Sequence, residues 1–164
     1  TQLENISPDA PHSKIPVGSH IELHQALKIY PGYSRSFIQL AKSVLFSNID
    51  LRIPFCEFIR YEPPKALETL RIISPDEFKV TRTSQSSEFG FPGANIHLPM
   101  SPASLVLQDD QLLSSTLKLN SEKQPDIVTL KCSVLAEPEQ WNFISVNQIK
   151  AILGDIASIK SVSP

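Results

Sequence analysis

The fold is decided by two stretches in the second half of the chain, STLKLN at residues 115–120 and DIVTLKCSVL at residues 126–135. Both are short apolar runs, and serine, aspartate and proline residues separate them. Runs of this kind between turn residues are typical of antiparallel strands. Two further runs, NIHL at residues 95–98 and SLVLQ at residues 104–108, have the same character. We therefore expect the four segments to form an antiparallel meander.

The segment that follows these strands carries a helical pattern. Ser145 and Gln148 have the spacing of a capping box, in which each side chain bonds to the other residue's backbone amide. Apolar residues then recur at helical spacing and would line one face: Val146, Ile149, Ile152, Leu153, Ile156 and Ile159. We expect an amphipathic helix that begins at residue 145 and packs on the sheet.

Two segments before the sheet are also interpreted as helices. Ser19 and Glu22 fit a second capping box, which predicts a helix over residues 19–30, although Ile21, Leu23, Leu27 and Ile29 also alternate as in a strand. After Pro31-Gly32, Ser34 can cap another helix reaching residue 45. Its apolar stripe has the i, i+3, i+4 spacing and comprises Phe37, Leu40, Ala41, Val44 and Leu45.

The middle of the first half mixes both kinds of element. Residues 49–61 are β-branched and aromatic and predict a strand, the run beginning at Pro64 and ending before Pro75 predicts a short helix, and FKVTRT at residues 78–83 alternates as a strand. The expected fold class is α+β: N-terminal helices, a central, mostly antiparallel sheet, and a C-terminal helix. We divide the chain into a flexible N-terminal arm, residues 1–18, and a single domain, residues 19–164.

Composition excludes several classes of function. The chain has 14 prolines and only 5 glycines, and neither glycine-rich phosphate-binding motif is present, which disfavours a conventional nucleotide site. A formal net charge of −2 disfavours a general nucleic-acid coat. No apolar run approaches the ~18 residues of a membrane span, and the first residues lack the features of a secretory signal. We expect no cofactor and an intracellular location, in the cytoplasm or nucleus.

Candidate catalytic and metal-binding groups are weakly marked. Cys56 and Cys132 lie in apolar surroundings, where buried free thiols are the usual outcome and a disulfide is the alternative. His20 and His24 are four residues apart and are the best metal candidates, but no third ligand is evident. Asp109 and Asp110 have the character of a solvated turn. Without a convergent nucleophile and base, the sequence favours a protein that is not an enzyme.

Two features point to a binding surface. All five arginines lie in the first half of the chain, and Arg52, Arg60 and Arg82 lie on or beside predicted strands, where neighbouring strands would bring them together. The segment at residues 84–93 combines glycines with Phe89 and Phe91, which is typical of a recognition loop when the rings do not fold back on the core. These five residues are the predicted partner-binding site.

The expected function is that of a non-enzymatic interaction or assembly module, as among viral structural and accessory proteins or the subunits of a complex. Its partner would be another protein or a second copy of the chain. The arginines alone do not select among a protein carboxylate, another anionic ligand, an acidic lipid surface and nucleic acid. The alternatives are a regulatory domain that senses a small molecule in its β-rich middle, and an enzyme with an unrecognised or metal-dependent site.

Overall fold

A computed structural model describes residues 7–10, 13–61, 68–89, 110–140 and 142–162. The expectation of an α+β fold with N-terminal helices is wrong. The described residues are mostly β, with 49% in strands and 11% in helices, and the one α-helix among them lies near the C-terminus. The described part of the chain contains no helix long and apolar enough to cross a membrane.

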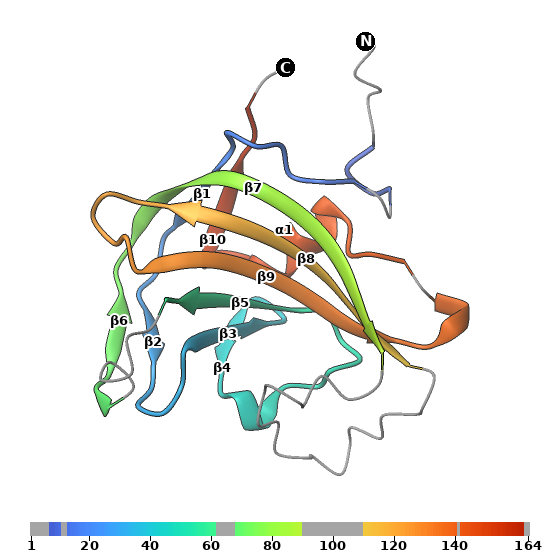
Figure 1. The fold of residues 1–164 in the computed structure, drawn as a ribbon, viewed down its shortest axis with the longest axis horizontal. Helices are drawn as coiled ribbons and strands as arrows, with labels where there is room; N and C mark the ends of the chain where they lie inside the picture. Colours follow the sequence, from blue (N-terminus) through green and yellow to red (C-terminus); the bar gives the residue numbers. More distant parts are fainter. Residues whose placement is uncertain (1–6, 11–12, 62–67, 90–109, 141, 163–164) are drawn as a thin grey trace.

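Eight strands form one curled antiparallel sheet in the order β10-β1-β7-β8-β9-β5-β3-β4 (Figure 1). Its strands are β1 (His20–Leu23), β3 (Arg35–Gln39), β4 (Lys42–Val44), β5 (Phe55–Arg60), β7 (Asp76–Phe89), β8 (Gln111–Asn120), β9 (Ile127–Ala136) and β10 (Ala157–Lys160). A small second sheet pairs β2 (Leu27–Ile29) with β6 (Arg71–Ile73). The helical elements are α1 (Val146–Leu153), η1 (Phe46–Asn48) and η4 (Pro138–Gln140).

The two stretches that dominate the sequence pattern form the centre of the sheet, as expected. Residues 111–120 and 127–136 are β8 and β9, which pair along their length. The strands expected within residues 49–61 and at residues 78–83 are present as β5 and part of β7. The runs at residues 95–98 and 104–108 lie outside the described residues.

The helix expected over residues 19–30 is replaced by β1 and β2. The buried apolar residues are Ile21, Leu23, Leu27 and Ile29, so the period-two pattern decided the structure and the helical one did not. Ser19 does not cap a helix. Its hydroxyl instead accepts a hydrogen bond from the amide of Val162, at 3.3 Å.

The helix expected over residues 34–45 is likewise a hairpin, β3 and β4, with Leu40 and Ala41 as its two-residue turn. The stripe was misleading because β3 lies between two hydrophobic clusters and buries both of its faces. Phe37 belongs to one cluster and the next residue, Ile38, to the other. The helix expected after Pro64 is also wrong where it can be seen, since residues 71–73 form β6; residues 62–67 lie outside the described part.

The C-terminal helix is confirmed, but it is shorter than expected. Ser145 and Gln148 make both hydrogen bonds of the capping box. The helix ends at Gly154, whose positive φ of 53° favours glycine. Beyond it, Ile156 and Ile159 belong to the turn into β10 and to β10 itself.

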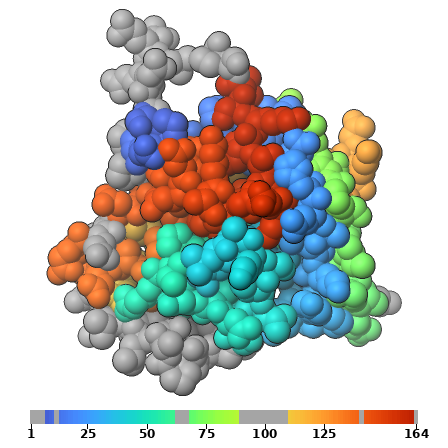
Figure 2. Space-filling model, turned by 180° about the vertical axis from the view of Figure 1, so that it is seen from behind, coloured from blue at the N-terminus to red at the C-terminus, as the bar shows by residue number. Residues whose placement is uncertain are grey.

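Most of the core belongs to one large cluster. The larger cluster joins α1 to the inner faces of the strands, and Ile15 also belongs to it. A smaller cluster lies on the other face of the sheet around Phe37, Phe55, Leu112 and Leu135. The C-terminal segment and the region of β3 and β4 lie side by side on one side of the molecule (Figure 2), where the amide of Ala41 bonds to the carbonyl of Ile152 at 2.9 Å.

The segment expected to be an N-terminal arm makes specific contacts in its described part. Ile15 is buried, and the Ser13 hydroxyl accepts a hydrogen bond from the amide of Val146, at 3.1 Å. The amide of Gly18 bonds to the carbonyl of Val80. Residues 13–18 are therefore fastened to α1 and β7.

Cys56 and Cys132 form a disulfide, so the expectation of free buried thiols is wrong. The two residues are direct partners in the pairing of β5 with β9, and both are buried. The two cysteines are 76 residues apart in sequence, so local sequence does not indicate their contact. The register of β5 with β9 brings them together.

Candidate functional site

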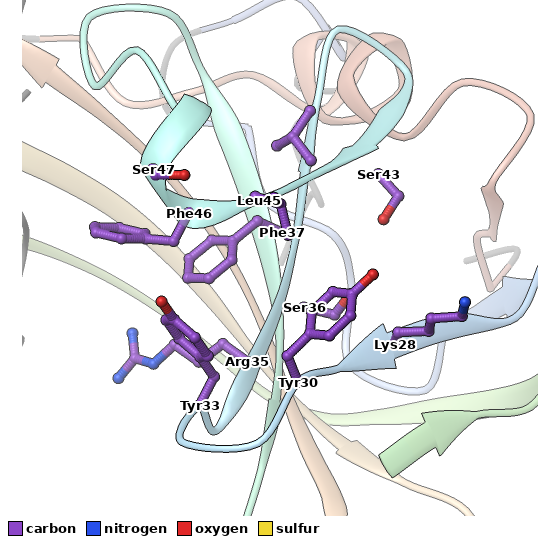
Figure 3. A pocket seen from close by; sticks show the side chains of 11 residues that line it. Lys28, Tyr30, Tyr33, Arg35, Ser36, Phe37, Ser43, Leu45, Phe46 and Ser47 are labelled. Carbon is purple, nitrogen blue, oxygen red and sulfur yellow. The ribbon is translucent and has the colours of Figure 1, made fainter. Parts of the chain in front are cut away.

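The candidate site is a surface hollow of about 200 Å³ between the β2–β3 turn, β3 and the start of η1 (Figure 3). We call it the aromatic hollow. Four aromatic residues line it: Tyr30, Tyr33, Phe37 and Phe46. Two aliphatic residues, three serines and two cations complete the lining, and no aspartate or glutamate belongs to it among the described residues.

A single turn positions the two tyrosines. Tyr30-Pro31-Gly32-Tyr33 closes with a hydrogen bond from the amide of Tyr33 to the carbonyl of Tyr30, at 3.0 Å. Pro31 presets its own φ, and Gly32 has a φ of +88°, the combination that a type II turn requires. The sequence therefore holds the two rings at the two ends of one tight turn.

The floor of the hollow belongs to the smaller hydrophobic cluster. Phe37 is buried and lies with its ring centroid 5.0 Å from that of Phe46, at an interplanar angle of 47°. Gln39 holds the segment that follows η1: its side-chain amide donates to the carbonyls of Asp50 and Ile53, and its side-chain oxygen accepts from the amide of Asp50. The floor is fixed by packing and hydrogen bonds.

The rim, in contrast, is exposed. Tyr30, Tyr33 and Leu45 are 45%, 48% and 51% accessible. Large side chains with this much exposure, gathered around one concavity, mark a binding surface more strongly than scattered apolar residues do. Tyrosine suits such a position because its ring is apolar and rigid, while its hydroxyl tolerates water.

Two cations lie on opposite sides of the aromatic group, Lys28 from β2 and Arg35 from β3 (Figure 3). Arg35 is already committed, because its Nη1 lies 3.1 Å from Oε1 of the buried Glu57. Lys28 is exposed and makes no ion pair within the described residues. The hollow thus offers one uncommitted positive charge.

The hollow also borders an open stretch of sheet edge. Pairing between β3 and β4 begins at Phe37 and does not include Arg35. On its other side β3 pairs with β5, and the carbonyl of Ser34 accepts a hydrogen bond from the amide of Arg60, at 2.9 Å. Because backbone groups alternate between the two sides of a strand, the amide and carbonyl of Arg35 point away from β5. They point to the side on which no described strand pairs.

The structure does not bring the sequence-predicted arginines together. β8 and β9 lie between β5, which carries Arg60, and β7, which carries Arg82, so these strands are not neighbours. Arg52 binds the buried Asp110, with Nη2 2.6 Å from Oδ2, and Arg60 is itself buried. Arg82 is exposed on β7 opposite Lys118. Partner binding by these residues stays a prediction.

Of the predicted recognition loop at residues 84–93, residues 84–89 continue β7, and Phe89 pairs with Gln111 of β8. Phe91 lies outside the described residues. Residues 84–89 are therefore strand and not loop, and the role of Phe89 and Phe91 in binding stays a prediction.

His20 and His24 lie on and beside a strand instead of a helix. Nδ1 of His20 is 3.7 Å from Oε1 of Glu77, and Nε2 of His24 is 2.8 Å from the hydroxyl of Ser158. Within the part of the chain that the structure covers, no three histidine, cysteine or acidic residues are arranged to hold a metal ion.

Sequence reasoning missed the aromatic hollow because it assigned residues 19–45 to helices. The available signal was the motif YPGY at residues 30–33, a Pro-Gly turn flanked by two tyrosines. A Pro-Gly turn is a turn signal with a mechanism, and in the structure it leaves both tyrosines about half exposed. Comparison of the chain with models of protein families, with curated proteins and with solved structures finds no match.

Proposed function

We propose that the protein is an interaction module that binds a protein partner through the aromatic hollow. The observation that carries the proposal is the pair of half-exposed tyrosines held by one turn above a fixed phenylalanine floor. Rigid aromatic anchors of this kind dominate the binding energy of protein interfaces, since they bury large areas at low cost in conformational entropy.

The size of the hollow supports a protein segment over a complete small-molecule ligand. About 200 Å³ is below the roughly 300–1,000 Å³ of pockets that enclose drug-sized ligands. It is enough to receive side chains from a partner that continues over the surrounding surface. In this hollow, a complete small-molecule ligand is therefore less well supported than a protein segment.

The disulfide bears on where the protein would act. Structural disulfides persist mainly in oxidising compartments. The buried cross-strand bond between Cys56 and Cys132 therefore supports an oxidising location as our proposal, in place of the cytoplasm or nucleus.

Selection of random peptides displayed on phage against the folded protein tests the function. The selected peptides should bind the Tyr30→Ser/Tyr33→Ser variant about tenfold or more weakly, because each truncated anchor costs about 1–2 kcal/mol. The matched control is Tyr61→Ser, which alters a tyrosine that is 70% exposed but outside the hollow. Unfolding curves must show that all variants fold.

Equal binding to the wild type and the double variant would contradict the proposal, as would a selection that enriches no peptide above a scrambled library. Binding that depends instead on Phe89 and Phe91 would return the function to the loop predicted from the sequence.

A further inference from the structure

We infer that the partner segment is extended and carries a carboxylate two residues away from an apolar side chain. The inference rests on the proposed function and adds the chemistry of the partner to it. Three features of the hollow carry it: an open backbone edge, a single uncommitted cation and an aromatic floor.

The open edge selects an extended conformation. The backbone amide and carbonyl of Arg35 face the side of β3 that β4 leaves unpaired, and Arg35 and Ser36 both line the hollow. An extended segment laid there forms main-chain hydrogen bonds as an added strand does. A helix cannot do so, because its own backbone groups are already bonded within the helix.

The cation selects a carboxylate. Lys28 lies at one end of the hollow with no acidic neighbour in ion-pair contact within the described chain, whereas Arg35 at the other end is held by Glu57. A carboxylate on the partner would therefore meet Lys28 and form a charge-assisted hydrogen bond. Lys28 is also the cross-strand neighbour of Ile72 on β6, which is exposed, so apolar surface continues on this side.

The aromatic floor selects the neighbouring side chain. An aliphatic or aromatic group of the partner would enter between Tyr30 and Tyr33 and rest on Phe37. In an extended segment, side chains alternate in direction, so the carboxylate and the inserted group stand two residues apart on the same face.

A single-stranded nucleic acid fits the hollow less well. Such ligands need stacking rings together with a row of cations that follows the phosphates. The hollow has the rings but only one uncommitted cation. Nucleic-acid binding is therefore retained as an outcome of the test.

The test uses the peptides selected by phage display, labelled with a fluorophore, and measures their Kd. Replacing the peptide's carboxylate residue by its amide should weaken binding about tenfold, and Lys28→Glu should do the same. Replacing the acid by lysine should restore binding to Lys28→Glu but not to the wild type. Lys79→Glu is the matched control, because Lys79 is exposed on β7 outside the hollow. N-methylation of single peptide amides should weaken binding at the position that pairs with Arg35.

The outcomes separate the inference from the proposed function. Binding that needs Tyr30 and Tyr33, but neither the carboxylate nor any peptide amide, overturns the inference and leaves the proposed function standing. Peptides that bind independently of the two tyrosines overturn both. An oligo-uridine strand that binds more tightly than the peptides, with affinity lost in Tyr30→Ser/Tyr33→Ser, replaces the protein partner by RNA.

Discussion

Tyr30 and Tyr33 are the first and last residues of one β-turn, and the amide of Tyr33 bonds to the carbonyl of Tyr30. The turn depends on Gly32, whose φ is +88° and around which an added Cβ would meet no atom within 4 Å. An alanine there fits sterically with its surroundings and is disfavoured only by its own backbone. The turn, and with it the spacing of the two rings, therefore depends on one conformational preference.

Gly32→Ala should lower stability by about 1 kcal/mol and weaken binding of the selected peptides, because alanine resists the left-handed region. Chemical denaturation measures the first effect, and fluorescence titration the second. Pro31→Ala is the control: it keeps a permitted conformation and should cost less in both assays. A Gly32→Ala variant with unchanged stability and affinity would show that the turn does not set the site.

The disulfide makes a large and separate contribution to stability. It closes a loop with a sequence separation of 76, for which the chain-entropy model gives about 4 kcal/mol. Cys56→Ala/Cys132→Ala should therefore shift the denaturation midpoint far down, and reducing agent should destabilise the wild type but not the variant. Identical midpoints for the oxidised and reduced wild type would contradict the bond.

Gly154 and Ala41 should be energetically coupled. A Cβ on Gly154 would overlap the Cβ of Ala41, and Gly154 also has a positive φ. Gly154→Ala should cost about 2 kcal/mol or more, from overpacking and backbone strain together. Ala41→Gly, nearly neutral alone, should recover the overpacking part in the double variant. A double-mutant cycle with no coupling would mean that the β3–β4 turn does not pack on the end of α1.

Acid should weaken the clamp between β6 and the β8–β9 connection. Arg71 donates to both carboxylate oxygens of Asp126, at 3.0 Å each, and this lowers the pKa of Asp126. A carboxylate with a depressed folded pKa stabilises the fold above its unfolded pKa of about 3.9, and this stabilisation is lost as pH falls through the folded pKa.

The matching variant is Arg71→Gln. The difference in unfolding free energy between wild type and Arg71→Gln should be present at neutral pH and shrink below about pH 4. Arg82→Gln, at an exposed position with no carboxylate in ion-pair contact among the described residues, should show no such trend. A difference that stays constant with pH would mean that Arg71 acts by packing alone.

Some acid sensitivity should remain in every variant because of Asp76. Burial opposes ionisation of Asp76, but hydrogen bonds from Ser121, Gln124 and the Glu77 amide outweigh it and lower its pKa.

The sequence pattern was a reliable guide to β8, to β9 and to the start of α1. β8 and β9 could be predicted because strand propensity and turn residues agreed with the final packing. The start of α1 could be predicted because the Ser145 capping box is local in sequence. Residues 19–45 misled because Leu23, Leu27 and Phe37, Leu40, Ala41 fit helical spacing equally well. In β3 the strand period prevails because a second hydrophobic cluster packs on its other face, and the local sequence does not reveal such long-range packing.

The candidate site was harder to predict than the fold. Lys28, Tyr30, Arg35 and Phe46 come from different elements, and only the order of the strands brings them to one concavity. The same strand order separates Arg60 from Arg82, which we had expected on neighbouring strands from the sequence. The disulfide was not predicted for the same reason, because only the register of β5 with β9 places the two cysteines opposite each other.

The most direct test is to map backbone amide signals by NMR while a display-selected acidic peptide is added to the folded protein. We predict that the largest shifts cluster at residues 28–37 and 43–47, and that hydrogen exchange at the Arg35 amide slows when the peptide is bound. Shifts concentrated at β10 or at the end of β7, with the Arg35 amide unchanged, would contradict the assignment of the aromatic hollow as the recognition site.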